Sequence, residues 1–184
     1  MNWNLPNILT LTRVLCIPLL VAVFYFAGPF AGLAAAVIFV LAAITDWLDG
    51  FLARRMGTTS KLGAFLDPVA DKLIVSSALV LLVSDFDVLN RVVSAEIFAV
   101  SVCIIIGREI VISALREWMA ELGSRGSIAV SMLGKIKTWV QMVAVAILLL
   151  ATPEQEMLTM IGFVAIYMAA IMTLWSMVQY IVLA

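Results

Sequence analysis

Long apolar runs limit what this chain can fold into more than any other feature of its sequence. Hydrophobic residues make up 65% of the 184 residues and charged residues only 12%, whereas a typical soluble domain carries roughly 25% charged residues. A helix that crosses a bilayer needs about 20 largely apolar residues. The sequence therefore predicts an all-α integral membrane protein with six transmembrane helices, in a single domain over residues 1–184. The predicted helices cover residues 6–26, 30–56, 61–83, 91–122, 128–151 and 157 to the end.

The start of the chain is predicted to be a short amphipathic segment at the membrane interface, because Asn7, Thr10 and Arg13 recur every three residues. The sequence contains no histidine, which excludes imidazole catalysis and imidazole metal ligands. Cys16 and Cys103 both lie in apolar runs, so we interpret them as packing residues and not as a disulfide or a metal site. We expect no signal peptide, because no basic side chain precedes Arg13.

Four aspartates lie in two pairs beside the apolar runs: Asp46 with Asp49, and Asp67 with Asp71. Carboxylates within membrane helices are costly and mark a functional site by default. Spacings of three and four residues place both members of a pair on one face of a helix. Four like charges at one point need protons or cations to neutralise them, and all-oxygen ligation favours Mg²⁺ or Mn²⁺ over Zn²⁺. The pattern therefore predicts a divalent-metal site, with helix caps and surface charges as the simpler alternative.

The residues around these aspartates form a longer motif. It reads Asp46-x-x-Asp49-Gly50-x-x-Ala53-Arg54, then eight residues, then Gly63-x-x-x-Asp67-x-x-x-Asp71. At every fixed position this string resembles the signature of the CDP-alcohol phosphotransferases. The resemblance implies that the four aspartates bind the metal, as two ions, and that Asp71 also acts as the general base. It implies that the donor's nucleotide contacts the other fixed residues, Gly50, Ala53, Arg54 and Gly63.

Matches elsewhere narrow the resemblance to family members that act on a lipid. They are Pro6-Asn7-x-x-Thr10-x-x-Arg13, Gly107-Arg108-Glu109, Ser113-Ala114-Leu115-Arg116-Glu117-Trp118 and Gly134-Lys135-x-Lys137-Thr138. Such members transfer the phosphatidyl group of CDP-diacylglycerol to sn-glycerol 3-phosphate in phospholipid biosynthesis, giving phosphatidylglycerophosphate and CMP. The resemblance implies that Asn7, Thr10 and Arg13 also face the donor. On the pattern alone, snorkelling of Arg13 to the interface is an equally good interpretation.

Three basic residues are predicted to form a pocket for the acceptor's phosphate: Arg108, Arg116 and Lys135. The two arginines are eight residues apart and therefore share a helix face. The alternative is that they pair with acidic neighbours, Glu109, Glu117 or Glu121. We interpret Lys137 and Arg125 as interfacial charges, and the uncharged last helix as packing against lipid or another subunit.

The distribution of basic residues predicts the topology. Nearly all of them, and all four aspartates, fall toward one side of the six-helix path, whereas Arg91 falls toward the other. The positive-inside rule then predicts that both termini and the active site face the cytoplasm. The resemblance implies a multi-pass protein of the bacterial inner (cytoplasmic) membrane. The resemblance further implies a homodimer among membrane lipids, and we expect no nucleic-acid partner.

Three other functions are compatible with parts of the sequence. Within the family, the acceptor could be another alcohol, such as inositol phosphate or a second lipid. A cation carrier would also place carboxylates in the membrane, but here the acids gather at one side and no charged residue continues across. A purely structural membrane protein is the third alternative, and it would not need four aligned acids.

Overall fold

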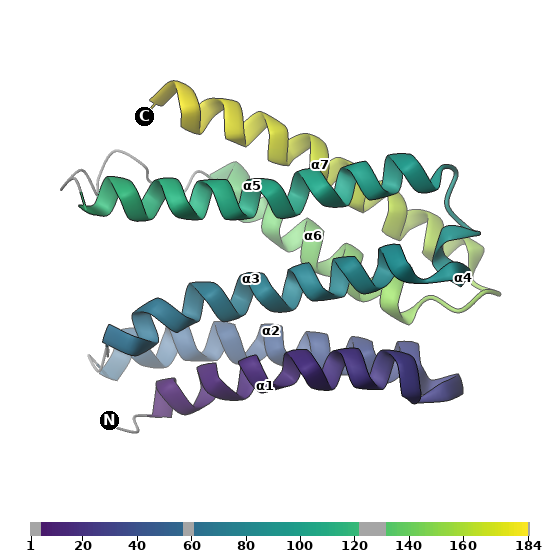
Figure 1. The fold of residues 1–184 in the computed structure, drawn as a ribbon, viewed down its shortest axis with the longest axis horizontal. Helices are drawn as coiled ribbons and strands as arrows, with labels where there is room; N and C mark the ends of the chain where they lie inside the picture. The colour runs from purple at the N-terminus through teal and green to yellow at the C-terminus, as the bar shows by residue number, and fades with distance from the viewer. Residues whose placement is uncertain (1–4, 57–60, 122–131, 184) are drawn as a thin grey trace. The chain divides into compact units, whose positions relative to one another are not determined.

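The computed structural model describes residues 5–56, 61–121 and 132–183. Side chains are described throughout these ranges except at 5–8, 47, 49–56, 61–65, 67, 116, 120–121, 132–135 and 179–183. In this part of the chain all regular structure is helical (Figure 1), which confirms the all-α prediction. The elements are α1 (Leu5–Phe26), the 3₁₀ turn η1 (Gly28–Phe30), α2 (Ala31–Met56), α3 (Lys61–Ser84), α4 (Phe86–Leu89), α5 (Ala95–Glu121), α6 (Met132–Leu150) and α7 (Glu156–Leu183).

The long helices follow the predicted ones closely, and the clear difference lies between α3 and α5. We predicted a turn over residues 84–90 followed directly by a helix, but the structure has the short α4 there and begins α5 at Ala95. Asp85 caps the start of α4 with its side chain. At the start of α5, Ser94 Oγ accepts a hydrogen bond from the Ile97 N–H at 3.2 Å. Because such caps satisfy the amides that a helix start leaves without partners, they fix both beginnings.

Four helices in the described part are long and apolar enough to cross a membrane. A fifth apolar stretch, Ile136–Leu150, is shorter. The four spans are Leu9–Phe26, Gly28–Asp46, Ala95–Met119 and Glu156–Val178. Their length and composition agree with the predicted class of a multi-pass membrane protein.

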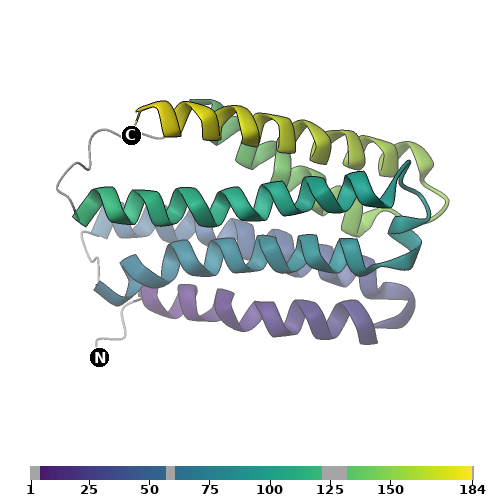
Figure 2. The same ribbon diagram turned by 45° about the horizontal axis from the view of Figure 1, so that its top comes forward.

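The chain divides into two compact units, of which the first covers Met1–Leu82. Within it, α1 and α2 form a hairpin of two packed helices (Figures 1 and 2). The chain reverses at Gly28, whose φ of 57° lies in the left-handed region that glycine adopts without strain. Among the described side chains of α2, three of the four buried ones are alanines, and small residues of this kind allow helices to approach closely. The four are Ala35, Ala36, Phe39 and Ala42.

The second unit covers Val83–Ala184, and in it α7 packs against both α5 and α6. Phe98 of α5 meets Phe163 of α7 edge to face, with ring centroids 5.2 Å apart. Gly162 of α7 lies directly against Leu148 of α6, since a Cβ at this glycine would come 2.7 Å from Leu148 Cδ2. The absent side chain therefore sets how closely α6 and α7 approach.

Arg91 ties together the segments at the end of this unit where α6 leads into α7. Its Nε donates to the Asp87 carbonyl at 2.8 Å. Its Nη1 lies 3.1 Å from each of three acceptors, the Ala151 and Thr152 carbonyls and Thr159 Oγ1. Because the last carbonyls of a helix have no partner within it, the guanidinium serves as a cap for the C-terminal end of α6.

Replacing Arg91 should loosen this end of the second unit. We expect Arg91→Lys to lower the free energy of unfolding by about 1–2 kcal/mol, because a compact ammonium cannot reach acceptors on three segments at once. Denaturant unfolding of the purified protein in detergent micelles measures the change. Glu154→Gln, in the exposed α6–α7 connection, is the matched control and should change stability by less than about 0.5 kcal/mol. Equal stability of both variants would contradict the capping role.

Candidate active site

An ion pair joins the first helix to the aspartate-bearing end of the second. Arg13 Nη1 of α1 lies 2.7 Å from Asp46 Oδ1 of α2. The arginine side chain is 1% exposed, whereas that of the aspartate is 43% exposed. Thr10, one turn before Arg13, is also fully buried. Arg13 is therefore directed at the aspartate and not at the surface, and Asp46 retains an accessible side.

The other predicted metal ligands are only partly described. Asp71 of α3 is half-buried. Asp49 and Asp67 lie on α2 and α3, but their side chains fall outside the described set. Among the described side chains, no three acidic groups come together as a metal site. The four-aspartate site thus stays a prediction, to which the structure adds the Arg13–Asp46 contact.

The same applies to several further predicted site residues, which lie on described helices but whose side chains are not described. On α1 and α2 they are Asn7, Gly50, Ala53 and Arg54. On the later helices they are Gly63 of α3, Arg116 of α5 and Lys135 of α6. Arg125 and Glu121 also lack a described side chain, and Arg125 lies outside the described helices.

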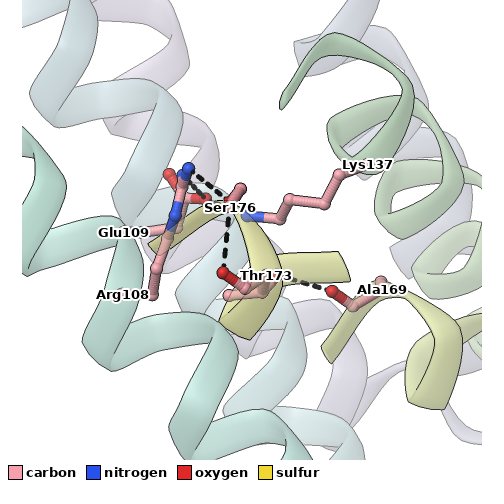
Figure 3. Close-up of polar contacts among 6 residues, drawn as sticks. All are labelled: Arg108, Glu109, Lys137, Ala169, Thr173 and Ser176. Carbon is pink, nitrogen blue, oxygen red and sulfur yellow. Dashed lines mark hydrogen bonds and ion pairs between the residues drawn. The ribbon is translucent and has the colours of Figure 1, made fainter. Parts of the chain in front are cut away.

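A second polar cluster lies inside the second unit, where three helices meet. Arg108 Nη1 lies 3.2 Å from Glu109 Oε1, and the same oxygen accepts a hydrogen bond from Lys137 Nζ. Arg108 is 7% exposed and Lys137 is 0% exposed. Figure 3 shows these side chains of α5 and α6 directed toward one another. One carboxylate oxygen thus binds two cations from different helices.

Helix α7 completes this cluster with a hydroxyl group. Ser176 Oγ accepts a hydrogen bond from Arg108 Nη2 at 2.9 Å (Figure 3). The serine donates its own proton to the Thr173 carbonyl at 3.1 Å. Thr173 in turn donates to the Ala169 carbonyl within α7. The guanidinium is therefore held from two sides, by a carboxylate on its own helix and by a hydroxyl on α7.

The cluster corrects two interpretations made from the sequence. Lys137 is not an interfacial charge, because it is completely buried and paired with Glu109. The last helix does more than pack, since it supplies Ser176 to Arg108. Pairing of Arg108 with Glu109 was anticipated as the alternative to phosphate binding, and the structure contains it. The sequence signal for this role of α7 is the spacing of Thr173 and Ser176, three residues apart on one face of a largely apolar helix.

Comparison with known proteins assigns this chain to a protein family. The family model described as CDP-alcohol phosphatidyltransferase matches residues 3–176. The chain belongs to this family. The match confirms the resemblance drawn from the aspartate motif, and it takes in both the Arg13–Asp46 pair and the Arg108 cluster as far as Ser176.

Curated relatives of the family cover nearly the whole chain. A protein of Sodalis glossinidius (strain morsitans) is 50% identical over 98% of this chain and 94% of its own length. Proteins of Salmonella choleraesuis (strain SC-B67) and Pectobacterium atrosepticum are 49% and 50% identical over the same shares. All three are named CDP-diacylglycerol–glycerol-3-phosphate 3-phosphatidyltransferase.

The ion pair between α5 and α6 should be energetically coupled. We expect Glu109→Gln to destabilise this family member by about 3 kcal/mol, because it leaves two buried cations without their shared carboxylate. Adding Lys137→Met removes one of those cations, so the double variant should lose less than the sum of the single variants. Denaturant unfolding in micelles gives the coupling energy.

The control for this cycle is Glu117→Gln, eight residues further along α5, where the glutamate is exposed. It should change stability by less than about 0.5 kcal/mol. Strict additivity of Glu109→Gln and Lys137→Met would show that their contact contributes nothing to the fold.

Proposed function

We propose that this protein transfers the phosphatidyl group of CDP-diacylglycerol to sn-glycerol 3-phosphate, releasing CMP and forming phosphatidylglycerophosphate. The observation that carries the proposal is identity of about half the residues, over 98% of the chain, with relatives named for this reaction. The acceptor's hydroxyl oxygen forms a bond to the phosphorus that carries diacylglycerol. The bond from that phosphorus to the oxygen of CMP breaks, and the hydroxyl proton passes to a base.

The donor's head group is assigned to residues of the first unit. Gly50, Ala53 and Gly63 leave room for the nucleotide to lie close to the helices, while Arg54 meets its phosphates. We also assign Asn7, Thr10 and Arg13, which lie on consecutive turns of α1, to the donor. The burial of Thr10 and the direction of Arg13 toward Asp46 support this assignment.

The aspartates suit a divalent cation. An all-carboxylate donor set matches Mg²⁺ or Mn²⁺, and Asp46 keeps an accessible side although it is already paired with Arg13. We assign Asp46, Asp49, Asp67 and Asp71 as ligands of two such ions. Bound ions would neutralise the pyrophosphate and stabilise the leaving phosphate of CMP. Asp71 takes the proton of the acceptor hydroxyl, since a carboxylate is the natural base in a chain without histidine.

The acceptor's phosphate is assigned to basic residues of the second unit, Arg108, Arg116 and Lys135. A guanidinium donates two parallel hydrogen bonds to a phosphate when its plane is correctly turned. The structure supports a phosphate-binding role for Arg108 in one respect: its guanidinium is buried, and Glu109 and Ser176 fix its orientation. A dianionic acceptor explains why cations lie inside an otherwise apolar helical unit, where they are costly.

We place the protein in the bacterial inner membrane with six crossings, its termini and active site toward the cytoplasm. The apolar helices and the bacterial relatives support a multi-pass membrane protein. The orientation rests on the distribution of basic residues. A cytoplasmic opening suits the chemistry, because glycerol 3-phosphate and CMP are soluble and charged while the donor's acyl chains stay in lipid. We further propose a homodimer, as the family resemblance implies.

The reaction should depend on a divalent cation and on Asp67. We expect purified protein in micelles to release CMP from CDP-diacylglycerol only when glycerol 3-phosphate and Mg²⁺ or Mn²⁺ are present, and chelation to stop the release. Asp67→Asn should reduce turnover by at least about 100-fold, because a neutral amide is a poor ligand for a hard cation. Inositol phosphate and other alcohols in the same assay test the acceptor.

Asp87→Asn is the matched control, because Asp87 is an exposed aspartate of α4, which follows α3 in the chain. It should retain full CMP release and the same chromatographic profile. Normal turnover by folded Asp67→Asn protein would remove the metal assignment, and CMP release that ignores glycerol 3-phosphate would remove the proposed acceptor.

Arg116 should govern the acceptor and not the donor. We expect Arg116→Ala to raise the KM for glycerol 3-phosphate by about tenfold or more, because a charge-assisted hydrogen bond to phosphate is lost. The KM for CDP-diacylglycerol should change little. Glu117→Gln, the neighbouring exposed position, serves as control and should leave both constants unchanged. The opposite pattern, with only the donor KM raised, would assign Arg116 to the donor.

A further inference from the structure

The hydrogen bond between Arg108 of α5 and Ser176 of α7 is not needed to neutralise the arginine, because Glu109 already does so. Ser176 is 1% exposed and lies 68 residues from Arg108 in the chain. A buried guanidinium already has a strong partner in Glu109, at 3.2 Å from Nη1. The serine binds the other terminal nitrogen, Nη2, at 2.9 Å. Two partners on different nitrogens and different helices restrict rotation of the guanidinium plane.

The serine is itself oriented by its own helix. Its proton is donated to the Thr173 carbonyl at 3.1 Å, so its lone pairs are the part of the hydroxyl that can face Arg108. This polarity is fixed, because a guanidinium only donates hydrogen bonds and cannot serve as an alternative acceptor for the serine proton. The Thr173 carbonyl therefore orients the Ser176 hydroxyl, so that its oxygen accepts the hydrogen bond from Arg108 Nη2.

The opposite edge is fixed from α5 and α6. Glu109 Oε1 accepts from Arg108 Nη1 and also from Lys137 Nζ, which is fully buried. Lys137 therefore holds the carboxylate that holds the arginine. The cluster thus takes Arg108 and Glu109 from α5, Lys137 from α6 and Ser176 from α7 (Figure 3).

We infer that Ser176 is a positioning residue for the acceptor, setting the plane in which Arg108 meets the phosphate of a small phosphorylated alcohol. This inference rests on the proposed function. An arginine that binds phosphate through two parallel hydrogen bonds depends on its orientation, and a misplacement of about 1 Å is costly. The hydroxyl on α7 therefore acts on acceptor affinity through Arg108, without touching the substrate.

The experiment compares three variants of α7 in the CMP-release assay, with both KM values and kcat measured. Ser176→Ala should raise the KM for glycerol 3-phosphate by about tenfold, the size expected when a hydrogen bond to a charged group is lost. The KM for CDP-diacylglycerol and kcat should stay within about twofold. Ser176→Thr keeps a hydroxyl and should restore most of the acceptor affinity.

Thr173→Val is the matched control, because Thr173 is equally buried on α7 and its hydroxyl donates to the Ala169 carbonyl (Figure 3). Valine keeps the backbone carbonyl that accepts from Ser176. It should leave the acceptor KM unchanged. Thermal unfolding of each variant accompanies the kinetics. A purely structural serine would lower the melting temperature and affect donor KM, acceptor KM and kcat together, and that result would overturn the inference.

The outcomes separate the inference from the proposed function. If the unmodified protein releases CMP with glycerol 3-phosphate but Ser176→Ala has a normal acceptor KM, the positioning role is wrong and the proposed function stands. If the unmodified protein releases no CMP with glycerol 3-phosphate, the proposed function is wrong and the inference fails with it. A selective rise in acceptor KM, restored by Ser176→Thr, supports both.

Discussion

Buried charge is the constraint on which this structure depends. In an apolar helical chain, each ionised group inside the fold needs a partner, because its transfer from water is costly. The described interior meets this need with two contacts between helices, Arg13 with Asp46 in the first unit and Lys137 with Glu109 in the second, and with the Arg108–Glu109 pair within α5. These ion pairs link the helix packing to the candidate chemistry, because Arg13, Asp46 and Arg108 are also the groups that we propose to bind donor, metal and acceptor.

Each unit uses its short side chains to make such contacts possible. Buried alanines line α2, which packs against α1, and Gly162 lets α7 lie against Leu148 of α6. Close packing of α1 and α2 shortens the distance over which Arg13 must reach Asp46, and α7 packs against both α5 and α6, the helices that carry Glu109 and Lys137. The polar contacts and the small residues are therefore two parts of one arrangement, in which backbone proximity precedes the ion pair.

The position of Ser176 changes how α7 is understood. Much of this helix is exposed and apolar, as a helix next to lipid would be, but Thr159, Thr173 and Ser176 are buried. Its polar face lies on the inside of the second unit, where it reaches Arg91 through Thr159 and Arg108 through Ser176. A helix without a charge near its site can still shape that site, because a single hydroxyl directs a guanidinium.

The sequence by itself determined the helical class, most helix positions and the family. Apolar runs of membrane length specify helices locally, and the motif from Asp46 to Asp71 is read from consecutive residues, so neither requires knowledge of distant contacts. The helix α5 starts later than predicted, because Ser94 caps it at Ala95 and the short α4, capped by Asp85, precedes it. Both caps are local signals in the sequence. The metal ligands and the acceptor residues Arg116 and Lys135 stay predictions.

Only the tertiary structure decided which charges pair. Lys137 meets Glu109 across 28 residues of chain, and Arg108 meets Ser176 across 68. Contacts between residues so far apart in the sequence depend on which helices pack together. The hydropathy pattern along the chain does not specify that packing. Lys137 therefore looked like an interfacial charge until the packing of α5, α6 and α7 placed it in the interior, beside the carboxylate that neutralises it.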